Sequence, residues 1–192
     1  MPRIVTCAVA VLAIAACAST PPPRFYTLSV TAPSGAAPAR LSVVVGPVSI
    51  PAIVDLPQIV VTTSPNQVTL DEFNRWASPL PNNISRVVVE NLVLLLGTPR
   101  VSQFQQSLNA EADFRVAIEV QRFESAPGEA AMLNAAWLVR RTRDGRAETG
   151  RTTVREPASD KGYDALAAAH SRALGRMSQD IATAMLALQR AP

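Results

Sequence analysis

The stretch DFRVAIEVQRF, residues 113–123, alternates between apolar and polar side chains over most of its length. Its apolar side chains recur at every second position: Phe114, Val116, Ile118 and Val120. A period of two places these side chains on one face of a strand and the charged side chains on the other. The pattern predicts a β-strand with one face on the hydrophobic core.

The segments around this strand extend it into a sheet. Residues 130–143 and 146–155 flank Asp144-Gly145, and Asp-Gly between two such runs is a strong signal for a tight hairpin turn. A long antiparallel meander is therefore expected from residue 113 to residue 155. Upstream, runs rich in β-branched residues predict further strands at residues 25–30, 41–50, 57–63, 68–70 and 100–105.

Two segments have helical patterns. Residues 84–96 are apolar on nearly every side and lie between a capping sequence, Pro81-Asn82-Asn83, and Gly97, which predicts a largely buried helix. Residues 160–189 carry an apolar stripe at spacings of three or four: Tyr163, Leu166, His170, Leu174, Met177, Ile181, Met185 and Leu188. Two long helices and a mixed β-sheet predict the α/β class, here a single α+β domain.

The first 16 residues have the pattern of a cleaved export signal. Arg3 precedes an apolar run at residues 4–16, which is too short to span a bilayer because a spanning helix needs about 20 apolar residues. The run ends in Ile14-Ala15-Ala16-Cys17, which resembles the cleavage site of bacterial lipoproteins. We therefore expect Cys17 to be lipidated. The alternative is an ordinary signal cut near Ala18.

The expected organisation has three parts: a signal peptide at 1–16, lipidated Cys17 with a proline-rich spacer at 17–24, and one globular domain at 25–192. Residues 18–24 reach at most about 23 Å when fully extended. The domain is therefore expected to sit close to the membrane. Because Ala18 rather than Asp follows the cysteine, the resemblance to lipoproteins favours the outer membrane.

The composition and motifs argue against catalysis. Loss of the signal leaves Cys17 as the only cysteine, which excludes an intramolecular disulfide or a Cys-based zinc site. His170 is the only histidine and falls on the apolar stripe, where a packed residue is expected rather than a base. Phosphate-binding glycine motifs are missing from the sequence. We expect no enzyme activity, no cofactor, no metal and no nucleic-acid partner.

Two segments are candidates for interactions. Arginines around the predicted turn at Asp144-Gly145 are either a solvated hairpin tip or a patch for anionic headgroups or an acidic protein. The segment at residues 73–80, in a loop or edge strand, holds Phe73, Arg75 and Trp76. These three side chains are candidates for a protein interface, because Trp and Arg are enriched among interface hot spots. Core packing beneath the start of the helix is the alternative.

Three segments are distinctive as a set: Arg24-Phe25-Tyr26-Thr27-Leu28, then Gly46-Pro47-Val48-Ser49-Ile50-Pro51 leading through residues 55–60, and then residues 73–80. Together they resemble the PqiC/YmbA family of auxiliary lipoproteins of ABC-type and MCE-type lipid transport systems. The resemblance follows the order and spacing of the whole mature chain, although the specific motifs all lie in residues 24–80.

The resemblance implies a compact sandwich similar to the N-terminal domain of TolB-like proteins. It also implies a non-catalytic lipoprotein on the periplasmic face of the outer membrane that docks onto an MCE-domain protein and assembles into a homo-oligomeric ring. Such a protein would serve intermembrane phospholipid transport and thereby maintain envelope integrity. Two alternatives remain open: a periplasmic lipid-binding carrier, which would need a concave apolar pocket, and an envelope enzyme.

Overall fold

The computed structural model describes residues 21–33, 40–104 and 112–191. The predicted signal peptide and Cys17 lie outside the described residues. The described residues form one mixed sheet and two long helices around a continuous hydrophobic core. This arrangement confirms the predicted fold class.

The sheet has eight strands within the described residues. They are β1 (Arg24–Tyr26), β2 (Val43–Ser49), β3 (Gln58–Ser64), β4 (Gln67–Trp76), β5 (Val101–Gln103), β6 (Phe114–Ala126), β7 (Ala130–Arg141) and β8 (Ala147–Pro157). The order runs β1-β4-β3-β6-β2-β5, and β7 and β8 extend the sheet from β6. A short 3-10 helix, η1 (Ala52–Val54), joins β2 to β3.

Strand β6 lies at the centre of the sheet and has the predicted alternation. The apolar side chains at 114, 116, 118 and 120 are buried, and most of the side chains between them reach solvent. Its first half pairs in parallel with β2, and Ser125 near its end pairs with Val61 of β3. Antiparallel pairing of β6 with β7 and of β7 with β8 confirms the predicted meander. Gly145 takes a positive φ of 74° in the turn, a conformation that glycine adopts without strain.

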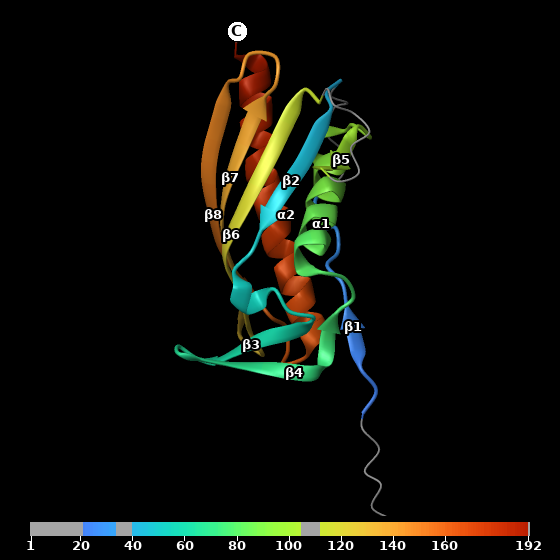
Figure 1. The fold of residues 1–192 in the computed structure, drawn as a ribbon, viewed down its shortest axis with the longest axis vertical. Coiled ribbons are helices and arrows are strands. Elements are labelled where there is room, and N and C mark those ends of the chain that lie inside the picture. The colour runs from blue at the N-terminus through green and yellow to red at the C-terminus, as the bar shows by residue number, and fades with distance from the viewer. Residues whose placement is uncertain (1–20, 34–39, 105–111, 192) are drawn as a thin grey trace, which may run out of the picture.

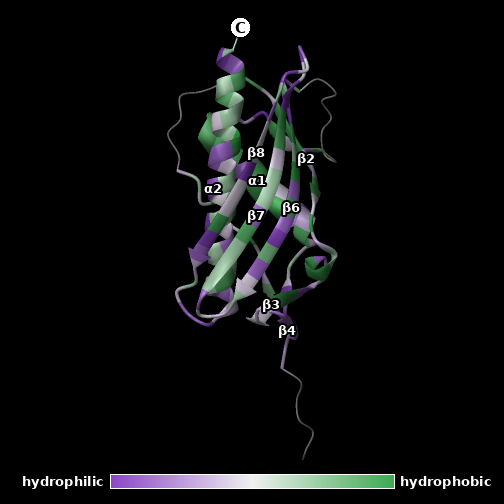
Figure 2. Cartoon of the chain, turned by 90° about the vertical axis from the view of Figure 1, so that its left-hand side faces the viewer, coloured by the Kyte–Doolittle hydropathy of each residue, from purple (hydrophilic) through white to green (hydrophobic). Residues whose placement is uncertain are grey.

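The two helices, α1 (Leu80–Leu96) and α2 (Tyr163–Arg190), lie on the same side of the sheet. Figure 2, seen from the β8 edge, shows both helices on one side and the strands β6, β7 and β8 uncovered on the other. The predicted stripe of α2 is buried from Leu166 to Leu188. No helix of the described residues is long and apolar enough to cross a membrane.

Helix α1 begins at Leu80, four residues before the predicted start. Pro81 falls in the first turn, where a missing N–H costs nothing because the first N–H groups of a helix have no internal partner. The predicted capping residue Asn83 therefore lies inside the helix. Its side chain is buried and accepts a hydrogen bond from Leu28 N at 3.3 Å.

The first strand is shorter than predicted, because β1 ends at Tyr26. The next residues, 28–32, form a strap along the groove between α1 and α2. Asn91 of α1 accepts hydrogen bonds from the backbone N–H groups of Thr31 (3.1 Å) and Ala32 (3.0 Å), and Ser171 of α2 accepts one from Ser29 N (3.0 Å). These side chains satisfy a backbone that a neighbouring strand would otherwise have to pair.

Arginine side chains join the helix layer to the sheet at two places. Glu156 of β8 is 5% exposed and accepts hydrogen bonds from Arg172 (3.1 Å) and Arg176 (2.5 Å) of α2. Burial alone would raise the pKa of Glu156, but the two guanidinium groups hold it below its ordinary value. Arg141 of β7 is buried and donates to the carbonyl oxygen of Leu188, so a cation closes the C-terminal end of α2.

Gly175 gives a test of the strap. A Cβ atom added at Gly175 would lie 2.2 Å from Thr31 Oγ1, so the change Gly175→Ala must displace the strap. We expect it to lower the free energy of unfolding by about 1–3 kcal/mol, although alanine is the better helix former. Urea unfolding measures the change. In a Thr31→Ala background the same substitution should be neutral or stabilising; an equal loss in both backgrounds would contradict the contact.

Candidate functional site

The candidate site is one face of the three strands β1, β4 and β3, at the end of the molecule where residues 21–23 lead into the fold (Figure 1). Paired residues on adjacent strands project from the same face, as do residues two apart on one strand. The register therefore places seven side chains on one face in three rungs: Phe25–Arg75–Gln58, Leu70–Val60 and Val68–Thr62. We call this surface the β1–β4–β3 face.

Large apolar side chains on this face are unusually exposed. Phe25 is 62% exposed, Leu70 45% and Val68 43%. Ile53 on η1, which lies beside the same face, is 56% exposed. The opposite side of these strands is covered, because Ile59 and Trp76 are buried in the core. Val60 is the exception on this face, because it is 8% exposed and packs with the core. Phe25, Leu70 and Val68 are apolar without being part of the core.

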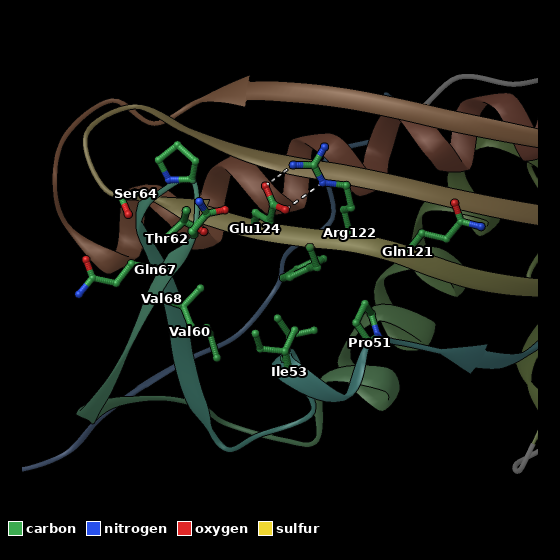
Figure 3. A pocket seen from close by; sticks show the side chains of 14 residues that line it. Pro51, Ile53, Val60, Thr62, Ser64, Gln67, Val68, Gln121, Arg122 and Glu124 are labelled. Atoms are coloured by element: carbon green, nitrogen blue, oxygen red, sulfur yellow. Dashed lines mark hydrogen bonds and ion pairs between the residues drawn. The ribbon is translucent and has the colours of Figure 1, made fainter.

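A pocket of about 460 Å³ opens between this face, η1 and β6. Ile53, Val60 and Val68 supply its apolar wall, and Figure 3 shows them across from β6. The β6 side carries Arg122 and Glu124, which form an ion pair with each other at 2.9 Å. Other surface pockets have volumes of about 480 and 530 Å³, so size does not single this pocket out.

Asp71 shapes the bulge of β4 that carries Phe73. Its carboxylate accepts hydrogen bonds from the backbone N–H groups of Phe73 (2.8 Å) and Asn74 (3.1 Å) and from the Tyr163 hydroxyl at the start of α2 (2.9 Å). Burial would raise the pKa of Asp71, but these three donors hold it below its ordinary value. The predicted short strand at 68–70 is part of the longer strand β4, which contains this bulge. Strand β4 lies inside the sheet, with β1 on one side and β3 on the other.

The structure separates the three residues predicted to contact a partner. Phe73 (36% exposed) and Arg75 are at the surface, and Arg75 pairs with Glu72 at 3.5 Å. Trp76 is only 6% exposed, which supports the core-packing alternative for this side chain. It packs edge-on against Phe123 of β6 and His170 of α2, with ring centroids 6.2 and 6.4 Å away.

His170 forms a pair with Ser125 that sequence spacing could not predict. Ser125 Oγ lies 2.8 Å from His170 Nε2, the distance expected for a nucleophile and its base. Both residues are buried, His170 completely, and its ring stacks on Phe123 at 3.8 Å. Burial lowers the pKa of His170 to about 3, so the ring is a weak base near neutral pH. The geometry is that of a structural pair in the core.

In the arginine-rich turn between β7 and β8, the carboxylate of Asp144 forms ion pairs with three arginines. Asp144 lies 2.5 Å from Arg141, 4.0 Å from Arg143 and 3.9 Å from Arg146. The hydrogen bond from Arg141 is the main cause that lowers the pKa of Asp144 to about 2. Of the two alternatives for this cluster, the structure favours a hairpin tip, because one of its arginines is a buried helix-closing residue. Among the described residues, no group of His, Cys, Asp or Glu is arranged to hold a metal ion.

The site is thus an exposed apolar face beside a tightly packed core. The sequence profile of the ABC-type transport auxiliary lipoprotein component matches residues 26–182, and the chain belongs to this family. Family membership makes it an auxiliary lipoprotein of an ABC-type transport system and places it at the membranes of the cell envelope. The resemblance read from residues 24–80 is thereby confirmed. No curated protein sequence matches the chain significantly.

Two solved structures share the fold. Protein XCC0632 from Xanthomonas campestris is 24% identical, with a TM-score of 0.71, and the match covers 86% of this chain and 97% of that one. An uncharacterized protein is 20% identical, with a TM-score of 0.70, over 86% of this chain and 99% of that one. At these identities the likeness concerns the fold alone.

Because His170 is buried, we expect the free energy of unfolding to fall in mild acid. The unfolded chain binds a proton near the ordinary histidine pKa of 6.5, whereas the folded chain binds it only near pH 3. The free energy of unfolding is therefore fully retained above pH 6.5 and falls below it by about 1.4 kcal/mol per pH unit. Urea unfolding at pH 7.5 and 5.5 measures this, with His170→Gln as the control that lacks the titration. Equal losses in both proteins would rule the explanation out.

Proposed function

We propose that this protein is a non-catalytic docking subunit of an MCE-type system that transports phospholipid between membranes. Lipidated Cys17 would hold it on the periplasmic face of the outer membrane. The observation that carries the proposal is the family match over residues 26–182, which covers α1, α2 as far as residue 182, and every strand except the first two residues of β1. The experiments below test the docking role and the outer-membrane location.

The short spacer supports a role at the membrane surface. Six residues separate Cys17 from β1, so Arg24 at the start of β1 lies within about 23 Å of Cys17. A protein held this close is suited to receiving a partner that reaches the membrane. It is less suited to carrying cargo across the periplasm, which requires a longer leash or none.

The interior also favours docking over lipid carriage. A lipid carrier needs a concave apolar pocket, and the apolar helix predicted at 84–96 could line one. Its residues Ile84, Val87, Val88 and Leu92 instead have no exposed surface and pack within the continuous core. The apolar character of α1 is thus accounted for by packing between α2 and the sheet.

The partner and assembly proposed are an MCE-domain protein and a homo-oligomeric ring of this chain. Several copies around one axis would provide a collar on which the end of an MCE assembly could rest. Transport would then draw on ATP hydrolysis by separate subunits, and this chain would contribute position. The sequence predicts Phe73, Arg75 and Trp76 as candidates for a protein interface, and of these Phe73 and Arg75 are at the surface.

The first test is the mass of a soluble form lacking residues 1–17, measured by light scattering with and without the periplasmic part of the MCE-domain protein. We expect a defined oligomer whose mass increases when the partner is added. A form that stays monomeric at high concentration and ignores the partner would count against the collar and in favour of a lipid carrier.

The second test concerns the anchor. The change Cys17→Ser removes the thiol that would be acylated, so we expect the protein to lose its acyl mass and to leave the membrane fraction. Intact-mass spectrometry and membrane fractionation measure the two effects, and density separation of inner and outer membranes tests the location. An unmodified wild-type Cys17 would refute the lipidation, and acylated protein in the inner membrane would refute the outer-membrane assignment.

A further inference from the structure

The exposed apolar side chains of this protein gather at one end. Among the described residues, eight large apolar side chains are exposed, and six of them belong to β1, β4 or the connection through η1 to β3. These six are Phe25, Ile53, Leu56, Val68, Leu70 and Phe73. A concentration of this kind marks a surface that is covered by something other than water.

The spacer emerges beside these side chains. Pro21 is the first described residue, and β1 follows at Arg24, paired with Asn74 of β4. Figure 1 shows residues 21–26 and the β3–β4 hairpin together at the end of the molecule opposite the C-terminus. Four residues from Cys17 to Pro21 span at most about 13 Å, and the eight to Phe25 at most about 26 Å. An acylated Cys17 therefore holds Phe25 within that distance of the bilayer.

The chemistry of the face fits a lipid surface. Aromatic and aliphatic side chains favour the boundary between headgroups and acyl chains, and arginines beside them meet anionic phosphates. On the face itself, Arg75 is paired with Phe25 across β4 and β1 and forms an ion pair with Glu72 at 3.5 Å. Arg24, the neighbour of Phe25 along β1, projects from the opposite side.

The geometry points to the β1–β4–β3 face as a membrane-contacting surface, on which Phe25, Leu70, Val68 and Ile53 enter the lipid interface. This inference rests on the acylation of Cys17 proposed above. It assigns Arg75 to lipid phosphates rather than to the protein contact predicted from the sequence. It also orients the domain, because the far end of α2 and the β7–β8 turn are then directed away from the lipid.

The mature chain is well suited to a direct test. Its only cysteine is acylated, so a single cysteine introduced elsewhere can carry a nitroxide spin label without competition. We would label Phe25→Cys and Leu70→Cys in the full lipidated chain, and Ala187→Cys as the matched control. Ala187 is exposed near the C-terminal end of α2, on the helix layer. The protein is reconstituted in vesicles of phosphatidylethanolamine and phosphatidylglycerol.

Accessibility of the label to oxygen, which concentrates in lipid, is compared with accessibility to a water-soluble nickel complex. We expect labels at 25 and 70 to favour oxygen and the label at 187 to favour nickel. Adding Leu70→Glu should raise nickel access at 25, and a thermal melt confirms that each variant is folded. Labels at 25 and 70 that match 187, on protein that floats with the vesicles, would overturn the inference.

Two further outcomes are kept distinct. Protein that does not float with the vesicles refutes the acyl anchor itself, and with it the basis of the inference. Labels that favour nickel on vesicles and become immobilised only when the MCE-domain protein is added would show a protein contact and overturn the lipid assignment.

Discussion

Parallel pairing of β1 with β4 is the contact on which the functional end of this molecule depends. It joins the segment that follows the spacer to β4, a strand whose other partner in the sheet is its hairpin neighbour β3. The same pairing aligns Phe25 with Arg75 on the outer face and Tyr26 with Trp76 on the inner face. One short strand therefore builds an exposed apolar surface on one side and extends the core on the other. Without this pairing, the spacer would be connected to a loop rather than to a strand of the sheet.

Further contacts connect the N-terminal segment to the rest of the structure. The strap at residues 28–32 is bonded to both helices through Asn83, Asn91 and Ser171, and the two helices share one core with the sheet. Trp76, Phe123 and His170 pack together where the hairpin, the central strand and α2 meet. The N-terminal segment is thus joined to both helices and to the sheet. Contacts of this kind are consistent with the proposed role, in which the domain contributes position.

Local patterns in the sequence were enough to predict β6, the Asp144-Gly145 turn and the buried stripe of α2. Each depends on spacing within one segment. The strap was missed because its hydrogen-bond partners are side chains 55 to 142 residues away, which no local pattern encodes. The Ser125–His170 pair was missed for the same reason. The three candidate interface residues were found as a motif, but only the register and the Asp71 bulge of β4 decide that Arg75 points outward and Trp76 inward.

We propose that this family member works as a membrane-held docking subunit of an MCE-type transporter. The proposal is tested by cross-linking the full chain in its own envelope, isolating it and quantifying the attached proteins by mass spectrometry, with Cys17→Ser as the reference. We expect an MCE-domain protein to be strongly enriched with the wild-type chain and lost with the reference. Acylated wild-type chain in the membrane that carries only copies of itself, or unrelated proteins, would refute the docking role.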